Sequence, residues 1–176
     1  SLSVKAGREI LTSNEVNKCL KSLSGEDEFV MWQNMLFDKS TGTIDHLDTY
    51  YLDTDPMGNL IAAWIALEDI DGEGGSFHVF PGSHIQTTKE WTKKSHEDYV
   101  YWCKNLASKY ERREAFLKKG DVLFWHPFLL HGSSNQKIKG KSRKSLTAHY
   151  YPINFLKGGG GINSKLNTEV YKNKLS

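Results

Sequence analysis

Two imidazoles and one carboxylate in this chain have the residue types and spacing of a metal site. His46 and Asp48 form an H-x-D pattern, and His131 follows much later in the chain. Two histidines and one carboxylate can occupy one face of Fe(II), which leaves other positions open for a co-substrate and O2. Because side chains alternate along a strand, His46 and Asp48 on one strand would point the same way. The pattern predicts a mononuclear, non-haem iron site.

A short H-x-D pattern is weak evidence alone, because a single histidine is more often a core or surface residue. A second such pattern begins at His96, in a charged stretch that does not resemble a strand. The segment after Gly120 favours the first pattern. Its two apolar runs, Val122–Trp125 and Phe128–Leu130, are separated at Pro127 and predict a buried strand, a turn or bulge, and a second strand leading to His131. A buried His131 needs a partner, which can be a metal or a backbone carbonyl.

The elements that must position these residues are short and mostly extended. Ser13 is a suitable N-cap for a helix that runs to about Leu23. The remaining segments are strands expected over Phe29–Phe37, Leu60–Leu67 and Ser76–Phe80, a turn at Thr41–Thr43 into the His46 strand, and a loop over Asp53–Asn59. Many short strands with Gly and Pro turns indicate an all-β sandwich or barrel.

The segment over residues 87–119 differs, because it is rich in charged and aromatic residues. Val100, Cys103 and Ala107 recur at helical spacing and predict a helix over about 95–112. This helix has two interpretations: a peripheral helix that packs on the sheet, or a lid over a substrate mouth. We expect a helical insert within a single domain spanning 1–176. The glycine run at 158–161 predicts a flexible C-terminal segment over about 156–176.

Composition excludes several classes of protein. The 176 residues fit one domain, and the net charge of +2 gives no nucleic-acid footprint. Two cysteines are too few for a disulfide framework, and no long apolar span or signal peptide is visible. We therefore expect a cytoplasmic protein without a membrane segment. The first residue is Ser1, which leaves open whether N-terminal or internal segments of a longer protein are missing.

Five stretches carry a resemblance to a known family, in that family's order and over roughly residues 29 to 152. They are His46-Leu47-Asp48-Thr49-Tyr50-Tyr51, Trp64-Ile65-Ala66-Leu67-Glu68-Asp69, Pro81-Gly82-Ser83-His84, Gly120-Asp121, and His131-Gly132-Ser133 followed by Arg143-Lys144-Ser145-Leu146. Together they resemble the phytanoyl-CoA dioxygenase family of Fe(II)/2-oxoglutarate oxygenases.

The resemblance implies a mainly β fold, a double-stranded β-helix of the jelly-roll or cupin type with flanking helices. It implies Fe(II) bound by His46, Asp48 and His131 inside the mouth. It also implies 2-oxoglutarate as co-substrate, with its distal carboxylate on Arg143. The planar fork of Arg suits a carboxylate better than Lys does.

Further pocket residues follow from the resemblance and from strand alternation. Ser133 matches a second donor of the family's 2-oxoglutarate pocket. Trp64 matches a pocket-lining aromatic, although a core role fits equally well. Alternation would place Tyr50 on the ligand face, and Gln33 and Met35 lie on an expected neighbouring strand, so all three are candidates for the substrate pocket. For His78, His126 and His149 we expect no functional role.

The implied activity is hydroxylation of an aliphatic C–H bond in a small organic substrate, with O2 consumed and succinate and CO2 released. Related halogenases lack the metal-binding carboxylate, so Asp48 predicts hydroxylation rather than chlorination. A non-catalytic jelly-roll ligand-binding protein remains an alternative, but it leaves Asp48, Ser133 and Arg143 unexplained. A cupin-type metalloprotein without 2-oxoglutarate would not need Arg143. The sequence does not indicate the substrate, whether it is CoA-linked, or the oligomeric state.

Overall fold

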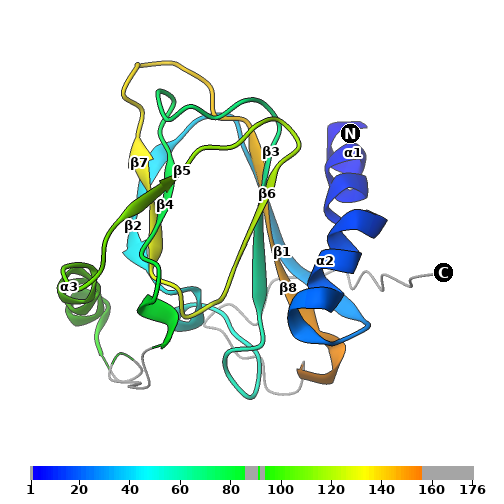
Figure 1. Cartoon of the computed structure of the whole chain (residues 1–176), viewed down its shortest axis with the longest axis horizontal. Helices are drawn as coiled ribbons and strands as arrows, with labels where there is room; N and C mark the ends of the chain where they lie inside the picture. Colours follow the sequence, from blue (N-terminus) through cyan, green and yellow to red (C-terminus); the bar gives the residue numbers. More distant parts are fainter. Residues whose placement is uncertain (1, 86–90, 92–93, 156–176) are drawn as a thin grey trace.

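Two four-stranded antiparallel sheets face each other in the computed structural model, which describes residues 2–85, 91 and 94–155 (Figure 1). Sheet one has the order β1-β8-β3-β6, with bounds Phe29–Phe37, Ser145–Pro152, Ile61–Ala66 and Val122–Trp125. Sheet two has the order β2-β7-β4-β5, with bounds Thr41–His46, His131–Asn135, Phe77–Val79 and Arg113–Ala115. This is the double-stranded β-helix of a jelly roll, so the predicted fold class is confirmed.

Helices α1 (Leu2–Leu11) and α2 (Asn14–Ser24) lie against the outer side of sheet one (Figure 1). The side chain of Ser13 accepts a hydrogen bond from the Val16 amide and starts α2, and Gly25, with φ 76°, ends it. The predicted helix from Ser13 is confirmed. Helix α1 precedes every element that the sequence pattern indicated.

Strands β3 and β8 are covered on both faces, and the alternation of side chains decides which residues contact the helices and which contact sheet two. Ala63 and Ile65 of β3 pack in a cluster with the helices, whereas Trp64 belongs to a second cluster that includes Phe77 of sheet two. Every residue of β8 is buried. The inward face of sheet one can therefore form the wall of a site between the sheets.

Helix α3 (His96–Ala107) lies on the side of sheet two (Figure 1). Its buried residues join a third cluster: Leu47, Phe80, Trp91, Tyr99, Cys103, Leu106 and Leu130. The predicted helix was too long, because the chain pairs with β4 from Arg113 and forms β5 there. Residues 87–90 and 92–93 of the expected insert lie outside the described residues, as does the whole segment 156–176.

Two local predictions were wrong. The segment Thr41–Thr43 is strand rather than turn, because Thr41 and Thr43 pair with Asn135 and Ser133 of β7. The apolar run Phe128–Leu130 is a turn rather than strand, with the Leu129 amide bonded to the His126 carbonyl at 2.9 Å. Leu130 is buried in the α3 cluster. Apolar character signalled burial correctly, but it did not distinguish a buried turn from a buried strand.

Candidate metal centre

Three potential ligands converge where β2 ends and β7 begins. His46 and His131 are ladder partners, and their ring centroids lie 4.3 Å apart. The Oδ1 atom of Asp48 lies 3.6 Å from His46 Nε2 and 3.5 Å from His131 Nε2. The three ligand atoms all lie within 4.8 Å of one another. This is the convergence that the two separated motifs predicted.

The H-x-D pattern reaches this geometry differently from the predicted single strand. Strand β2 ends at His46, and Asp48 is the first residue of the 3-10 helix η1 (Asp48–Tyr50). The extended backbone of Leu47 between them keeps both side chains on one side. The Tyr99 hydroxyl fixes Leu47, because it donates to the Leu47 carbonyl at 3.1 Å and accepts from the Leu47 amide at 2.6 Å.

Each ligand imidazole is oriented by a backbone carbonyl. Nδ1 of His46 lies 2.8 Å from the Ile44 carbonyl, and Nδ1 of His131 lies 2.8 Å from the Leu129 carbonyl. A carbonyl only accepts, so Nδ1 carries the proton and Nε2 keeps a lone pair. The backbone carbonyl is therefore the partner of Nδ1 in each histidine, and Nε2 is left available for a metal.

Burial and charge set the protonation of the three groups. Burial lowers the pKa of His131, which favours the neutral, metal-binding form. Burial would raise the pKa of Asp48, but His131 and His149 outweigh it and hold this pKa well below its ordinary value. Burial would lower the pKa of His46, but the neighbouring Asp48 carboxylate, the Ile44 carbonyl and the charge of Asp45 together outweigh that effect and raise this pKa.

A cavity of about 220 Å³ opens beside this cluster, between the two sheets. Four residues predicted for the pocket line it: Arg143, Ser133, Trp64 and Met35. Tyr50 and Gln33 are not among its lining residues. Because Tyr50 lies on η1 rather than on a strand, its ring turns away and stacks on Tyr99, with centroids 3.7 Å apart.

Arg143 is a buried cation in the cavity wall. Its side chain lies over the Trp64 ring, 5.4 Å from the centroid, and the residue is 5% exposed. Among the described residues, its Nε and Nη1 atoms have no hydrogen-bond partner, and burial lowers its pKa to about 10. Arg143 lies just before β8 of sheet one, so it faces the cluster from the opposite sheet.

Sequence reasoning missed two residues at the site. Trp125 of β6 and His149 of β8 both line the cavity and both approach Asp48. For His149 a signal existed, because Arg143, Thr147 and His149 are separated by even numbers and alternation predicts one common face. Trp125 belonged to an apolar run with no feature that marked it as functional.

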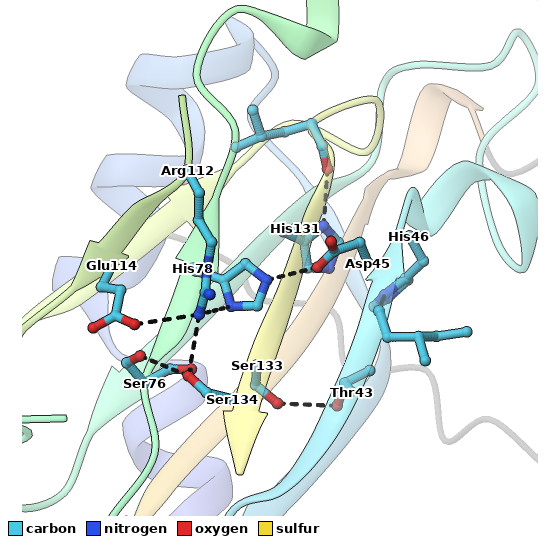
Figure 2. A network of polar contacts seen from close by, with 12 residues as sticks. Thr43, Asp45, His46, Ser76, His78, Arg112, Glu114, His131, Ser133 and Ser134 are labelled. Carbon is cyan, nitrogen blue, oxygen red and sulfur yellow. Dashed lines mark hydrogen bonds and ion pairs between the residues drawn. The ribbon is translucent and has the colours of Figure 1, made fainter. Parts of the chain in front are cut away.

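The outer face of sheet two carries a polar network directly behind the ligands (Figure 2). Asp45 Oδ1 and His78 Nε2 lie 2.6 Å apart, and Arg112 Nη2 lies 3.2 Å from His78 Nδ1. Arg112 also bonds Glu114, at 3.2 Å. The contact between Asp45 and His78 passes over Gly132, where an added Cβ would lie 2.7 Å from Asp45 Oδ1. His78 therefore has a structural part, since it links β4 to the strand of His46, and its lack of a functional role stays a prediction.

Comparisons with known proteins agree with this fold and site. The fold and the cluster of two histidines and one carboxylate are those of the jelly-roll non-haem iron oxygenases. The pattern of the phytanoyl-CoA dioxygenase (PhyH) family matches residues 4–145, so the chain belongs to this family, as the motifs indicated.

The peroxisomal phytanoyl-CoA dioxygenase of Mus musculus is 33% identical over 115 residues, which is 60% of this chain and 32% of the relative. The Homo sapiens enzyme is 32% identical over 109 residues, with the same coverage of each chain. The chain thus spans about a third of the length of these curated relatives.

Two solved structures share the fold. One is the non-haem α-ketoglutarate-dependent carbocyclase SnoK from nogalamycin biosynthesis, with TM-score 0.68 and 20% identity over 81% of this chain and 57% of that one. The other is EctD from S. alaskensis with 2-oxoglutarate and 5-hydroxyectoine, with TM-score 0.66 and 20% identity over 84% and 52%. Within the part of the chain that the structure describes, no helix has the length and apolar character to cross a bilayer.

Proposed function

We propose that this chain carries the active site of an Fe(II)- and 2-oxoglutarate-dependent dioxygenase, which hydroxylates an aliphatic C–H bond of a small organic substrate. One observation carries the proposal: the buried Arg143, whose Nε and Nη1 have no hydrogen-bond partner within the described part of the chain, faces the cavity that also holds His46, Asp48 and His131. A buried, unpaired cation is costly, so this site favours an anionic ligand.

The donor set fits the proposed metal. His46 and His131 would supply one ring nitrogen each and Asp48 one carboxylate oxygen, which suits Fe(II) and leaves positions open. Two neutral imidazoles and one carboxylate would leave the centre with one positive charge, so it attracts an anion. When bound, the iron and 2-oxoglutarate supply the oxidising chemistry with O2, and succinate and CO2 are released.

The protein's part is to bind and orient. Arg143 would hold the distal carboxylate of 2-oxoglutarate with two parallel hydrogen bonds. Ser133 lines the same cavity, and its hydroxyl donates to Thr43 Oγ1 at 3.1 Å, so it can be redirected to the ligand. The rings of Trp64 and Phe77, whose centroids lie 5.3 Å apart, form an apolar part of the cavity wall beside Arg143.

The presence of Asp48 favours hydroxylation over chlorination, because a carboxylate fills the position that chloride would need. The solved neighbours include a carbocyclase and an epimerase. The reaction must therefore be identified by its product. Asp48→Ala should abolish turnover, since the centre loses a ligand and its charge balance.

The test is anaerobic loading with Fe(II) and 2-oxoglutarate, followed by O2 and a screen of small acids and acyl-CoA thioesters. We expect substrate-dependent succinate release and a hydroxylated product. Arg143→Ala should lose 2-oxoglutarate binding, whereas Lys144→Ala, which removes the exposed neighbouring cation, should keep it. Metal binding without 2-oxoglutarate binding would indicate a cupin-type metalloprotein. Binding of neither would indicate a non-catalytic ligand-binding protein.

The partners and the cellular location of the chain follow from the proposed activity and from composition. We propose a small-molecule substrate and O2 as the partners. The cytoplasmic location expected from composition stays a prediction, because the matched mouse and human enzymes are named as peroxisomal.

A further inference from the structure

Sheet one approaches the two oxygens of Asp48 unequally. The indole Nε1 of Trp125 donates to Asp48 Oδ2 at 2.8 Å, and Nε2 of His149 lies 3.5 Å from the same oxygen. The other oxygen, Oδ1, faces the ring nitrogens of His46 and His131. The carboxylate therefore lies between the candidate metal position and two side chains from the opposite sheet.

We propose that Trp125 and His149 are positioning residues that hold Oδ2 of Asp48, so that only Oδ1 is offered to the metal. The inference rests on the proposed function and adds two residues to it. Asp48 needs such support because it begins η1, two residues beyond His46, where the β2 ladder ends. The terminal torsion of a carboxylate is otherwise broad, so its orientation must come from its contacts.

Trp125 is suited to this task because it is rigid and can only donate. The residue is 5% exposed, and its ring centroid lies 4.9 Å from that of Phe77 and 5.2 Å from that of His131. A buried indole N–H requires an acceptor, and Oδ2 is the acceptor that it has. The hydrogen bond therefore fixes both side chains.

His149 lies ready as a second donor. The residue is 3% exposed, and neither ring nitrogen has a hydrogen-bond partner among the described residues. The 3.5 Å separation from Oδ2 is slightly longer than an ordinary hydrogen bond. A small rotation of the carboxylate would bring the imidazole into bonding distance, and it would then hold Oδ2 from a second direction.

The chemical consequence is single-oxygen coordination. An aspartate with both oxygens free can bind a metal through both and occupy two positions. With Oδ2 held by Trp125 and His149, Asp48 occupies one position and leaves the remainder for the co-substrate and O2.

The test uses Co(II) alone as the probe, bound to the full chain. Trp125→Phe keeps a packed aromatic ring and removes the N–H. We expect Co(II) affinity to fall roughly 10- to 100-fold, the usual effect of losing a hydrogen bond to a metal ligand. The visible absorption spectrum of bound Co(II) should also change, because a second oxygen from Asp48 would alter the ligand set of the metal. His149→Leu should weaken Co(II) binding independently, which covers the case in which Trp125→Phe folds poorly.

Trp91→Phe is the matched control, because Trp91 is equally buried but lies in the α3 cluster. Wild-type affinity and spectrum in Trp125→Phe would overturn the inference, as would an equal loss in Trp91→Phe. Failure of the wild-type chain to bind Co(II) is a different result, because it would overturn the proposed function itself.

Discussion

At the scale of single residues, adjacent serines of β7 face different environments. Ser133 lines the cavity, whereas Ser134 lies in the outer network, with its Oγ 2.9 Å from that of Ser76. Alternation along the strand produces this division. The two residues thus form a natural pair for separating ligand contacts from structural ones.

We expect Ser133→Ala to weaken 2-oxoglutarate binding about ten- to a hundredfold, since a hydrogen bond to a charged group contributes roughly 1.5 to 3 kcal/mol. Arg143→Ala should have a larger effect. Binding is measured by calorimetry on the Fe(II)-loaded chain without O2. Ser134→Ala is the control and should bind 2-oxoglutarate like the wild type. If both serine variants bind alike, Ser133 has no part in the clamp.

The candidate metal residues could be predicted because their types are distinctive and their motifs fix the spacing. Tyr50 could not, since its prediction assumed a strand that continues past His46, and the chain turns into η1 instead. Trp125 and His149 could not be predicted as site residues for another reason. Their contacts with Asp48 cross between two sheets, and a pattern along one strand carries no information about such contacts.

At the scale of elements, Gly132 of β7 lies in close contact with β2 and β4, on the side of sheet two behind the ligands. A Cβ there would lie 2.7 Å from Asp45 Oδ1, 2.9 Å from His78 Nε2 and 2.9 Å from the Thr43 carbonyl oxygen. Real side chains do not tolerate such approaches, so the strands would have to separate. His131, which precedes Gly132 in the chain, and His46, its ladder partner on β2, would then move apart.

Gly132→Ala should therefore lower the free energy of unfolding by about 1 to 3 kcal/mol, measured by urea denaturation. It should also weaken Co(II) binding. Gly7→Ala is the matched control, because a Cβ on Gly7 of α1 would meet Leu146 at an ordinary 3.6 Å. That variant should be neutral or stabilising by up to about 1 kcal/mol. Equal stability of the two variants would show that β7 can relax around the added methyl.

Helix α3 contacts the segment of the candidate metal ligands through the Tyr99 hydroxyl, which bonds the backbone of Leu47 between His46 and Asp48. Tyr99→Phe would leave the Leu47 amide without its partner, whereas the Leu47 carbonyl would keep the Tyr50 amide at 3.3 Å. The expected cost is about 1 to 3 kcal/mol in unfolding free energy. Tyr101→Phe, on the same helix but 68% exposed, should be neutral. Both are compared by chemical denaturation. A neutral Tyr99→Phe would mean that water replaces the hydroxyl.

The burial of Tyr99, Cys103 and Leu106 supports the packing interpretation of α3 over the lid interpretation. Closure of the segment over substrate stays a prediction. It is checked by hydrogen exchange, which should slow between 94 and 119 when substrate joins the iron and 2-oxoglutarate complex.

At the scale of the molecule, most strands and two helices could be predicted, because their patterns are local: alternation, apolar runs and a Ser cap. The lengths of α3 and β7 could not, since pairing with β4 and packing around Leu130 decide them. The assignment of Arg143 to the sheet opposite the histidines depends on topology, which spacing alone does not specify.

Ligands that bind only the folded chain should raise its thermal stability. At free concentrations about a hundred times the dissociation constant, one ligand adds about 2.7 kcal/mol. For a chain of this size each kcal/mol raises the melting temperature by about 2 to 4 °C, so we expect a rise of roughly 5 to 10 °C. Calorimetric scans without O2 should show this rise with Mn(II), and a further rise with 2-oxoglutarate. In Arg143→Ala only the second rise should disappear.

Arg143 lies beside one sheet and the two histidines lie on the other, so the distance between the sheets limits the length of a dicarboxylate that can contact both. A dicarboxylate held at both ends must bridge the gap between the two sheets. Strand β8, which follows Arg143, is buried along its whole length, and this burial opposes a shift of Arg143 toward a shorter molecule. A diacid lacking one methylene would reach one wall and miss the other. A diacid with one additional methylene would have to bend and would then contact Trp64. The spacing of the walls, more than any single contact, would then select the co-substrate.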